Sequence, residues 1–245
     1  SDMWLEFRRV LFRSAEIHFY GAGCGTPKPL GILKTILESI FSNAKVFIAE
    51  DMLAAVYAAS GNAPAIVCIL GTGSNSCFYN GENMEMVADS LGYILMDEAS
   101  GNYFGKILIV DYFYNTMPKK IAQKFSKEFD LDADHIKKNL YRETNPNMYL
   151  ASFAKFMFDF KEDKYIKKII KKGFQEFFKY RVLPYNKTSE TPIYFIGSIA
   201  YFFRDILEKV AQKNNLVISD VIQRPIDNLL KYHKETIIDI VNNNF

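Results

Sequence analysis

Apolar positions in the first third of the chain alternate between short runs that are typical of strands and longer stretches with helical spacing. Three runs predict strands and two stretches predict the helices between them, in chain order strand 16–20, helix 28–41, strand 45–49, helix 52–59 and strand 65–70. A further strand over 76–79 follows a glycine-containing turn and ends at Asn80-Gly81. This alternation predicts an α/β sheet with helices packed against it.

The rest of the chain has mainly helical periodicity. The pattern predicts helices over 100–114, 118–129, 134–140, 148–158 and 165–180, a strand over 192–197, a helix over 198–213, a strand over 216–221 and a last helix from Pro225. Phenylalanines at helical spacing in this part predict core positions, among them Phe153, Phe156, Phe158, Phe160, Phe174, Phe177 and Phe178.

A small-residue turn, Gly71-Thr72-Gly73-Ser74, directly follows the strand over 65–70. Two glycines let the backbone approach a ligand closely, and the hydroxyls and free amides of the turn suit phosphate oxygens. The turn is not a P-loop, because no Lys-Ser/Thr pair follows and the chain continues into a strand. An ordinary tight hairpin turn is the alternative interpretation.

Carboxylates and other small-residue turns also occur where apolar runs end. Asp51 ends a strand, where an α/β sheet presents ligand-binding residues, although Asp is also a common N-cap. The pair Asp97-Glu98 precedes a helix, where it could simply stabilise the helix dipole. Gly197-Ser198 connects a strand to a helix, with Ser198 as an alternative N-cap, and Gly21-Ala22-Gly23 ends the first strand.

Taken together, these segments resemble one known family. They are similar to the BadF/BadG/BcrA/BcrD ATPase family and its N-acetylglucosamine kinase-like members in four stretches, in this order: 47–55, 69–76, 91–101 and 194–200. The stretches 18–24 and 229–233 support the resemblance. The resemblance runs from about Glu16 to His233. It implies the two-lobed actin-like ATPase (ribonuclease H-like) α/β fold, with the nucleotide held between the lobes.

The resemblance also implies a reaction, in which ATP with Mg²⁺ phosphorylates the 6-hydroxyl of an amino sugar of the N-acetylglucosamine type. Asp51 matches the catalytic base, and the phosphates would bind Gly71, Thr72, Gly73 and Ser74. The adenosine would lie at Gly197, Ser198 and Ala200, and the sugar would be contacted by Gly21, Ala22, Gly23, Asn75, Gly92, Asp97 and Glu98; no residue is assigned as a metal ligand.

The chain departs from the family pattern at two places. Similar proteins have glycine where this chain has Met96 and Ala99, so the fit of the sugar is an open question. No Asp-x-Gly-x-Thr sequence, the family's first phosphate loop, lies within residues 1–15. We therefore expect a truncated N-terminal lobe and reduced or lost activity, with a non-catalytic sugar- or nucleotide-binding remnant as the alternative.

Composition changes most strongly at the N-terminus. Residues 1–14 hold the single Trp and three of seven arginines, which predicts a foreign or scrambled leader; an amphipathic segment with Trp4, Phe7, Leu11 and Phe12 on one face is the alternative. The expected division is a partial N-terminal lobe over 15–88 and a C-terminal lobe over 89–245, with a helical insertion over about 100–182.

Overall composition predicts a cytoplasmic enzyme with a small-molecule substrate. A net charge of +2 with dispersed lysines argues against nucleic-acid binding, and no segment reads as a membrane span or signal peptide. Three cysteines without CxxC spacing predict buried thiols, which disfavours the third alternative, a dehydratase-activating ATPase with a cysteine-bound cluster. Similar kinases often form homodimers, which stays open here.

Overall fold

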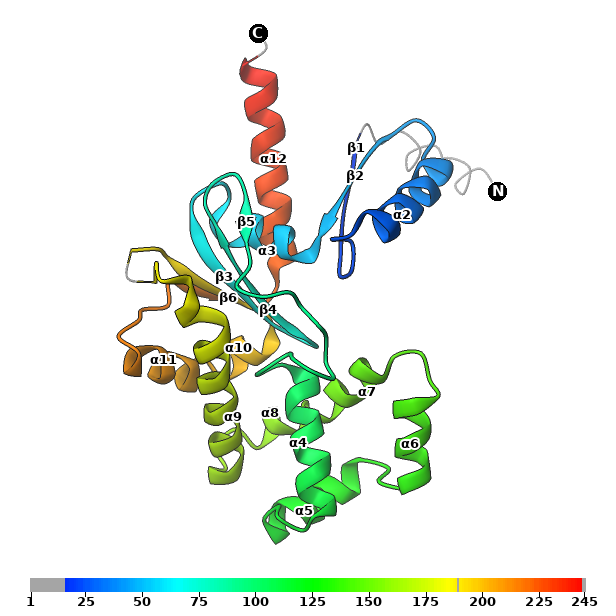
Figure 1. The fold of residues 1–245 in the computed structure, drawn as a ribbon, viewed down its shortest axis with the longest axis vertical. Coiled ribbons are helices and arrows are strands. Elements are labelled where there is room, and N and C mark those ends of the chain that lie inside the picture. The colour runs from blue at the N-terminus through cyan, green and yellow to red at the C-terminus, as the bar shows by residue number, and fades with distance from the viewer. Residues whose placement is uncertain (1–15, 189, 244–245) are drawn as a thin grey trace.

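The computed structural model describes residues 16–188 and 190–243, so the expected leader over 1–14 lies outside the described residues. The chain forms two separate β-sheets with helices around them (Figure 1). The smaller sheet has two strands, and the larger has five in the order β5-β4-β3-β6-β7.

The smaller sheet pairs β1 (Glu16–Gly21) with β2 (Lys45–Glu50) in parallel, and α2 (Pro27–Ile40) connects them. The register sets Gly21 opposite Glu50, so both strands reach the same edge together. α2 is described along its whole length and has no buried residue. This part of the molecule therefore has little core of its own, and in Figure 1 it extends away from the larger sheet.

The larger sheet is built around β3 (Ala65–Leu70), which pairs antiparallel with β4 (Ser74–Tyr79) and parallel with β6 (Ile193–Ile196). The short strands β5 (Met84–Glu85) and β7 (Asp220–Ile222) complete its two edges. Alternate residues of β3 point to opposite faces, as the two-residue period of a strand requires. Ile66, Cys68 and Leu70 enter one core cluster, whereas Ala65 and Val67 enter another.

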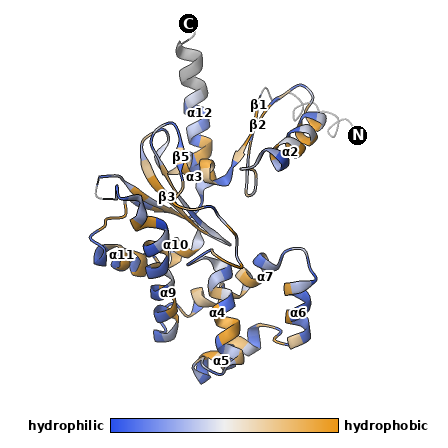
Figure 2. Cartoon of the chain, viewed as in Figure 1, coloured by the Kyte–Doolittle hydropathy of each residue, from blue (hydrophilic) through white to orange (hydrophobic). Residues whose placement is uncertain are grey.

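Helices cover both faces of this sheet. α3 (Asp51–Ser60) supplies Met52 and Val56 to the smaller core cluster, and α12 (Pro225–Asn243) packs against α3. The larger cluster is formed with the remaining helices: α4 (Gly101–Phe113), α5 (Lys119–Glu128), α6 (Ala133–Tyr141), α7 (Pro146–Phe153), α8 (Phe156–Asp159), α9 (Lys164–Phe177), α10 (Ser198–Phe202) and α11 (Arg204–Lys213). Figure 2 shows hydrophobic and hydrophilic residues side by side on these helices, as amphipathic packing requires.

The α/β alternation predicted from the sequence is confirmed, but three long helices are interrupted. The expected helix over 148–158 is split into α7 and α8, because the N–H groups of Ala154 and Lys155 bond three residues back, to Ala151 and Ser152. Hydrogen bonds that reach three residues back wind the backbone more tightly than an α-helix, and such turns commonly end one. The helix over 198–213 breaks at the buried Phe203, with φ −115° and ψ 28°. α9 is followed by a π-helix (Phe178–Val182) and a 3₁₀ turn (Leu183–Tyr185).

The strand order of the larger sheet indicates where the chain divides into two structural units. A boundary near Ala88 was expected, but β3, β4 and β5 lie in one sheet with β6 and β7. α3 also packs on that sheet rather than on the small one. We therefore propose that the smaller unit ends near Glu50. No helix in the part of the chain that the structure describes is long and apolar enough to cross a membrane.

The packing of α4 against α7 predicts that Gly105→Ala is destabilising. A β-carbon at Gly105 would overlap the carbonyl of Leu150, so the helices must separate. We expect the free energy of unfolding to fall by about 1–3 kcal/mol, as measured by urea denaturation.

Gly31→Ala in α2 is the matched control, because a β-carbon there meets no atom within 4 Å. It should leave stability unchanged or raise it by up to about 1 kcal/mol, since Ala is the better helix former. Equal stabilities for the two variants would contradict the close α4–α7 approach.

Candidate functional site

The turn Gly71–Ser74 lies at the carboxyl end of β3, and the start of α4 docks onto it. The N–H of Gly101 donates to the carbonyl of Gly71 at 2.8 Å, and the N–H of Asn102 donates to the carbonyl of Thr72 at 3.0 Å. Thr72 is exposed, and a β-carbon on Gly71 would meet no atom within 4 Å. The backbone of the turn is therefore fixed by α4 and open to a ligand.

A cavity of about 320 Å³ opens beside this turn. The segment that begins with Ser198 reaches the same cavity, and Lys155 adds a cation to its wall. Its full lining is Gly71, Thr72, Gly101, Met148, Ala151, Ser152, Ala154, Lys155, Phe158, Ser198 and Ile199. Gly71 and Thr72 of the predicted phosphate turn and Ser198 of the predicted adenosine site thus line one cavity, whose volume is within the range of ligand sites.

Gly197 brings these two segments together. It has φ 115°, and a β-carbon on it would overlap the carbonyl of Leu70, the last residue of β3. Only glycine fits this conformation and this approach. Gly197, rather than Ser198, occupies the N-cap position of α10, and no side chain caps that helix. Ala200 is buried in the core.

Asp97 lies directly beside the turn. Its side chain is buried, and its Oδ2 accepts a hydrogen bond from Asn102 Nδ2 at 2.8 Å. A β-carbon on Gly73 would lie 2.9 Å from the same oxygen. Neither Asp97 nor Glu98 belongs to the first turn of α4, which begins at Gly101 behind the N-cap Ser100. Helix-dipole stabilisation is therefore not a sufficient explanation for this acidic pair.

The two departures from the family's glycines differ in backbone conformation. Ala99 has φ 60° and Asp97 has φ 70°, both in the left-handed region. A side chain at position 99 thus costs conformational energy that glycine would not. Met96 is not among the positive-φ residues, and its sulfur contacts Arg181 Nη2 at 3.0 Å.

Asp51 is the first residue of α3, at the carboxyl end of β2, while Glu50 takes the N-cap position without a capping hydrogen bond. Partial burial raises the pKa of Asp51 above its ordinary value, against the lowering effect of backbone N–H groups at residues 51 and 52. It lines a cavity of about 500 Å³ together with His18, Phe19, Tyr20, Ala54, Ala55, Ile69, Ile196, Pro225, Ile226 and Leu229.

The glycine turn after β1 reaches the same edge as Asp51. Gly21 pairs with Glu50 in the sheet register, and the N–H of Cys24 closes the turn onto the Gly21 carbonyl at 3.2 Å. Ala22 lies inside this turn, and Gly23 has φ 79°, a conformation that glycine adopts most readily. The turn and Asp51 thus come from the carboxyl ends of neighbouring parallel strands.

The predicted residues therefore form two groups along the ends of β3 and β6. The cavity at Asp51 includes Ile69 and Ile196, and the cavity at the phosphate turn includes Gly71 and Ser198, with no residue in common. Asn75 pairs with Ile69 in the β3–β4 ladder. Gly92, with φ 77°, forms a turn before Asp97, closed by the N–H of Met96.

Two side chains of this site were missed from the sequence, Lys155 and Asn102. Lys155 lies at the break between α7 and α8, and the helical periodicity gives no sign of that break. Asn102 follows the Asp97-Glu98 pair closely, but nothing in its spacing marks it as a partner of Asp97.

Among the residues that the structure describes, no three His, Cys, Asp or Glu side chains come together as a metal site. Mg²⁺ that arrives with a nucleotide is usually held by the phosphates, waters and one or two carboxylates. Asp97 beside Gly73 offers one such carboxylate next to the phosphate turn.

Comparison with solved structures gives clear matches. A candidate N-acetylglucosamine kinase from Porphyromonas gingivalis superposes with a TM-score of 0.84 at 35% identity, over 89% of this chain and 77% of the other. A candidate N-acetylglucosamine kinase from Chromobacterium violaceum gives 0.62 at 18% identity, over 82% and 71%. MreB5 of Spiroplasma citri, solved with ADP bound, gives 0.50 at 13%, over 99% and 76%.

The last two likenesses concern the fold alone, and they show the actin-like α/β fold that the sequence predicted. No family model matches the chain. No curated protein matches it either.

The contact between Gly197 and Leu70 predicts that Gly197→Ala destabilises the protein. Its backbone conformation is essentially restricted to glycine, so strain alone should lower the free energy of unfolding by about 1–3 kcal/mol. Gly71→Ala is the control: its β-carbon has open space, and stability should stay within about 1 kcal/mol of the wild type. Urea denaturation measures both, and wild-type stability of Gly197→Ala would disprove the close approach.

Proposed function

The chain belongs to the family of N-acetylglucosamine kinase-like sugar kinases, and we propose that it transfers the γ-phosphoryl group of ATP to the 6-hydroxyl of an amino sugar. The observation that carries this proposal is that Gly71 and Thr72 of the turn line one cavity together with Ser198 and Lys155. The narrower assignment to the BadF/BadG/BcrA/BcrD ATPases, and a cytoplasmic location, remain predictions.

The cavity at the turn is suited to the nucleotide. The N–H of Gly71 already donates to the Gly73 carbonyl at 3.0 Å, so the amides of Thr72 and Gly73 would cradle the phosphate oxygens, and Lys155 would offset part of their charge. A β-carbon on Gly71 would meet no atom within 4 Å, so a ligand has room there. The connection from β6 to α10 at Ser198 would border the adenosine. When bound, MgATP would supply the γ-phosphoryl group, and its Mg²⁺ would neutralise part of the charge on the phosphates.

Asp97 would orient the sugar. Its Oδ2 is held by Asn102, which leaves Oδ1 as the acceptor for a sugar hydroxyl. The carboxylate stands next to Gly73, so a hydroxyl bound there would lie close to the phosphate turn. The loop around Gly92 and the turn Gly21–Gly23 would provide the remaining walls, with Glu98 and Asn75 nearby.

Asp51 would accept the proton of the attacking hydroxyl. Asp51 begins α3, which packs Met52 and Val56 onto the larger sheet, and a well-placed base contributes about 10²–10⁴-fold to the rate. Its cavity contains Ile69, two residues before Gly71, so Asp51 approaches the same strand end from the other side.

A non-catalytic sugar- or nucleotide-binding protein is the second candidate. The observation that favours it is that Asp51 and the phosphate turn line different cavities with no shared residue. Transfer therefore requires the two bound substrates to meet between these cavities, at the end of β3 that lies between Ile69 and Gly71. The function of a dehydratase-activating ATPase, which needs a cysteine-bound cluster, fits less well, because Cys24, Cys68 and Cys77 are all buried.

Replacement of the base tests the reaction directly. In Asp51→Asn, sugar-dependent ADP release from MgATP with N-acetylglucosamine should fall by about 10²–10⁴-fold. ADP binding, measured by calorimetry, should stay unchanged because Asp51 lines the other cavity.

Asp134→Asn is the matched control, since Asp134 also lies in the first turn of a helix but is exposed on α6. Nucleotide and sugar binding without turnover in the wild type would support the second candidate. Turnover that survives in Asp51→Asn would exclude Asp51 as the base.

The pH dependence follows from the raised pKa of Asp51. The base acts as a carboxylate, so kcat/KM should rise with pH through this pKa, at a midpoint above the ordinary value of 3.8. Because the pKa of Asp51 is raised in the folded protein, ionisation of this carboxyl destabilises the folded state. The free energy of unfolding of the wild type should therefore fall, relative to that of Asp51→Asn, as the pH rises from 3.8 through the raised pKa. Rate profiles and denaturation at several pH values measure both effects; parallel stabilities at every pH would contradict the shift.

A further inference from the structure

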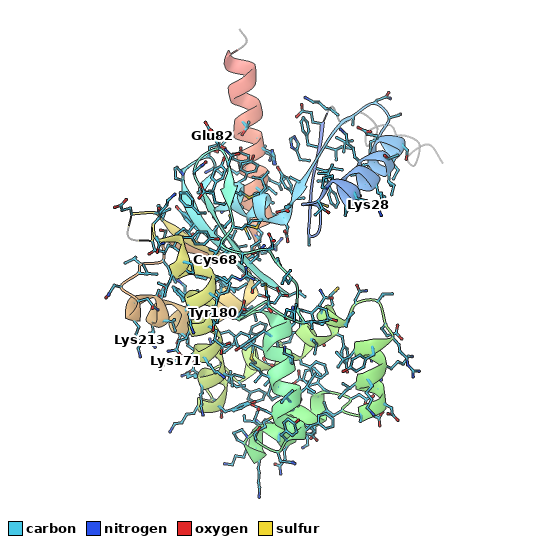
Figure 3. The ribbon with its side chains drawn as sticks, in the orientation of Figure 1. Lys28, Cys68, Glu82, Lys171, Tyr180 and Lys213 are labelled. Atoms are coloured by element: carbon cyan, nitrogen blue, oxygen red, sulfur yellow. The ribbon has the colours of Figure 1, made fainter. Side chains whose placement is uncertain are left out.

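Arg181 is a buried arginine whose side chain is only 3% exposed. It belongs to the π-helix Phe178–Val182, where its neighbours Lys179 and Tyr180 are exposed while Phe178 and Val182 enter the core. Figure 3 labels Tyr180 below Cys68 of the sheet. A π-turn inserts one residue into a helix, and such turns occur frequently at functional sites. Here it directs a guanidinium into the interior.

Within the described part of the chain, the polar contacts of the guanidinium all go to residues between Ala88 and Glu98. Nη2 donates to the sulfur of Met96 at 3.0 Å, and Nη1 donates to the carbonyl of Ala88 at 3.4 Å. Nε lies 3.5 Å from Glu98 Oε2 in an ion pair. These three partners span residues 88–98, here called the substrate loop, which also contains Gly92 and Asp97 of the proposed sugar site.

At its C-terminal end the substrate loop is also held by Asn102, which donates to Asp97, and by Ser74, which donates to the Glu98 carbonyl, so Arg181 is the partner that reaches its earlier residues as well. The loop lies between β5 and α4 without regular structure, and Leu91, Ile94 and Leu95 on it are exposed by 58–71%. Its own turn is closed by backbone bonds to the Gly92 carbonyl. The exposed part of the loop around Leu91–Leu95 opens at low free-energy cost unless another group holds it.

Arg181 itself is fixed to the larger sheet. Its backbone carbonyl accepts a hydrogen bond from Ser76 Oγ at 2.6 Å, and Ser76 also lies 3.1 Å from the hydroxyl of Tyr185. Ser76 is in β4, the strand that leaves the phosphate turn. The guanidinium therefore connects the substrate loop to the strand that carries the proposed phosphate site.

We propose that Arg181 is the positioning residue for the sugar, and that it holds Asp97 and Glu98 in place relative to the phosphate turn. This inference rests on the proposed kinase function. The planar fork of arginine reaches an oxygen, a sulfur and a carboxylate at once, which the compact ammonium of lysine does not. Glu98 Oε2 is buried without a hydrogen-bond donor, so the charge of Arg181 compensates it.

The test compares Arg181→Met and Arg181→Lys with Arg204→Met. Arg204 is the matched control, because it is half-exposed and pairs with Glu208 and Asp220 on the surface. In both Arg181 variants the KM for N-acetylglucosamine should rise by about 10- to 100-fold, the cost of a small misplacement, while the KM for ATP stays within about twofold. Amide hydrogen exchange over 88–98 should accelerate.

Each outcome decides a separate point. A parallel rise of both KM values, or unchanged exchange over 88–98, would show that Arg181 is only structural and would overturn the inference. If Arg181→Met does not fold because it leaves Glu98 unpaired, Arg181→Lys retains the charge and carries the same comparison. If the kinase proposal itself is wrong, the wild-type protein will show no sugar-dependent turnover. Amide hydrogen exchange over 88–98 in the Arg181 variants would still test whether Arg181 anchors the loop.

Discussion

The approach of Gly197 to the carbonyl of Leu70 fixes where the site can form. β3 is paired on both sides, with β4 antiparallel and β6 parallel, so its position is determined by the core. Gly197 lets the chain leave β6 immediately above the end of β3. The two strand ends then face the same space, and the segments that follow them, at Gly71 and Ser198, become the wall of one cavity.

A buried polar network converts this strand end into a defined site. Ser100 Oγ donates to Asn102 Oδ1 at 2.9 Å, and Asn102 Nδ2 donates to Asp97. Ser74 Oγ donates to the carbonyl of Glu98 at 2.7 Å, which ties the loop to the turn. These bonds hold Asp97 and Ala99 in the left-handed region, where non-glycine residues persist only if their surroundings enforce it.

Local sequence patterns predicted the parts of this arrangement that local physics decides. The fully apolar run at 65–70 and the glycines after it gave the central strand and its turn, because a buried strand needs little besides its own side chains. Features that local patterns do not decide depend on distant contacts. The sheet membership of β3 to β5 is set by pairing with β6, more than a hundred residues away, and neither Lys155 nor Arg181 follows a periodicity that would reveal its irregular helical turn.

The position of Asp51 shows why strand assignment alone does not define the unit to which a residue belongs. It directly follows β2 of the small sheet, yet the helix it begins packs Met52 and Val56 onto the five-stranded sheet. α12 reinforces this: Asn228 Nδ2 donates to the Ala58 carbonyl at 3.0 Å. The proposed base is therefore anchored to the larger unit, together with the phosphate turn. Motion of the small sheet would move the turn at Gly21–Gly23 against Asp51 more than it would move Asp51 itself.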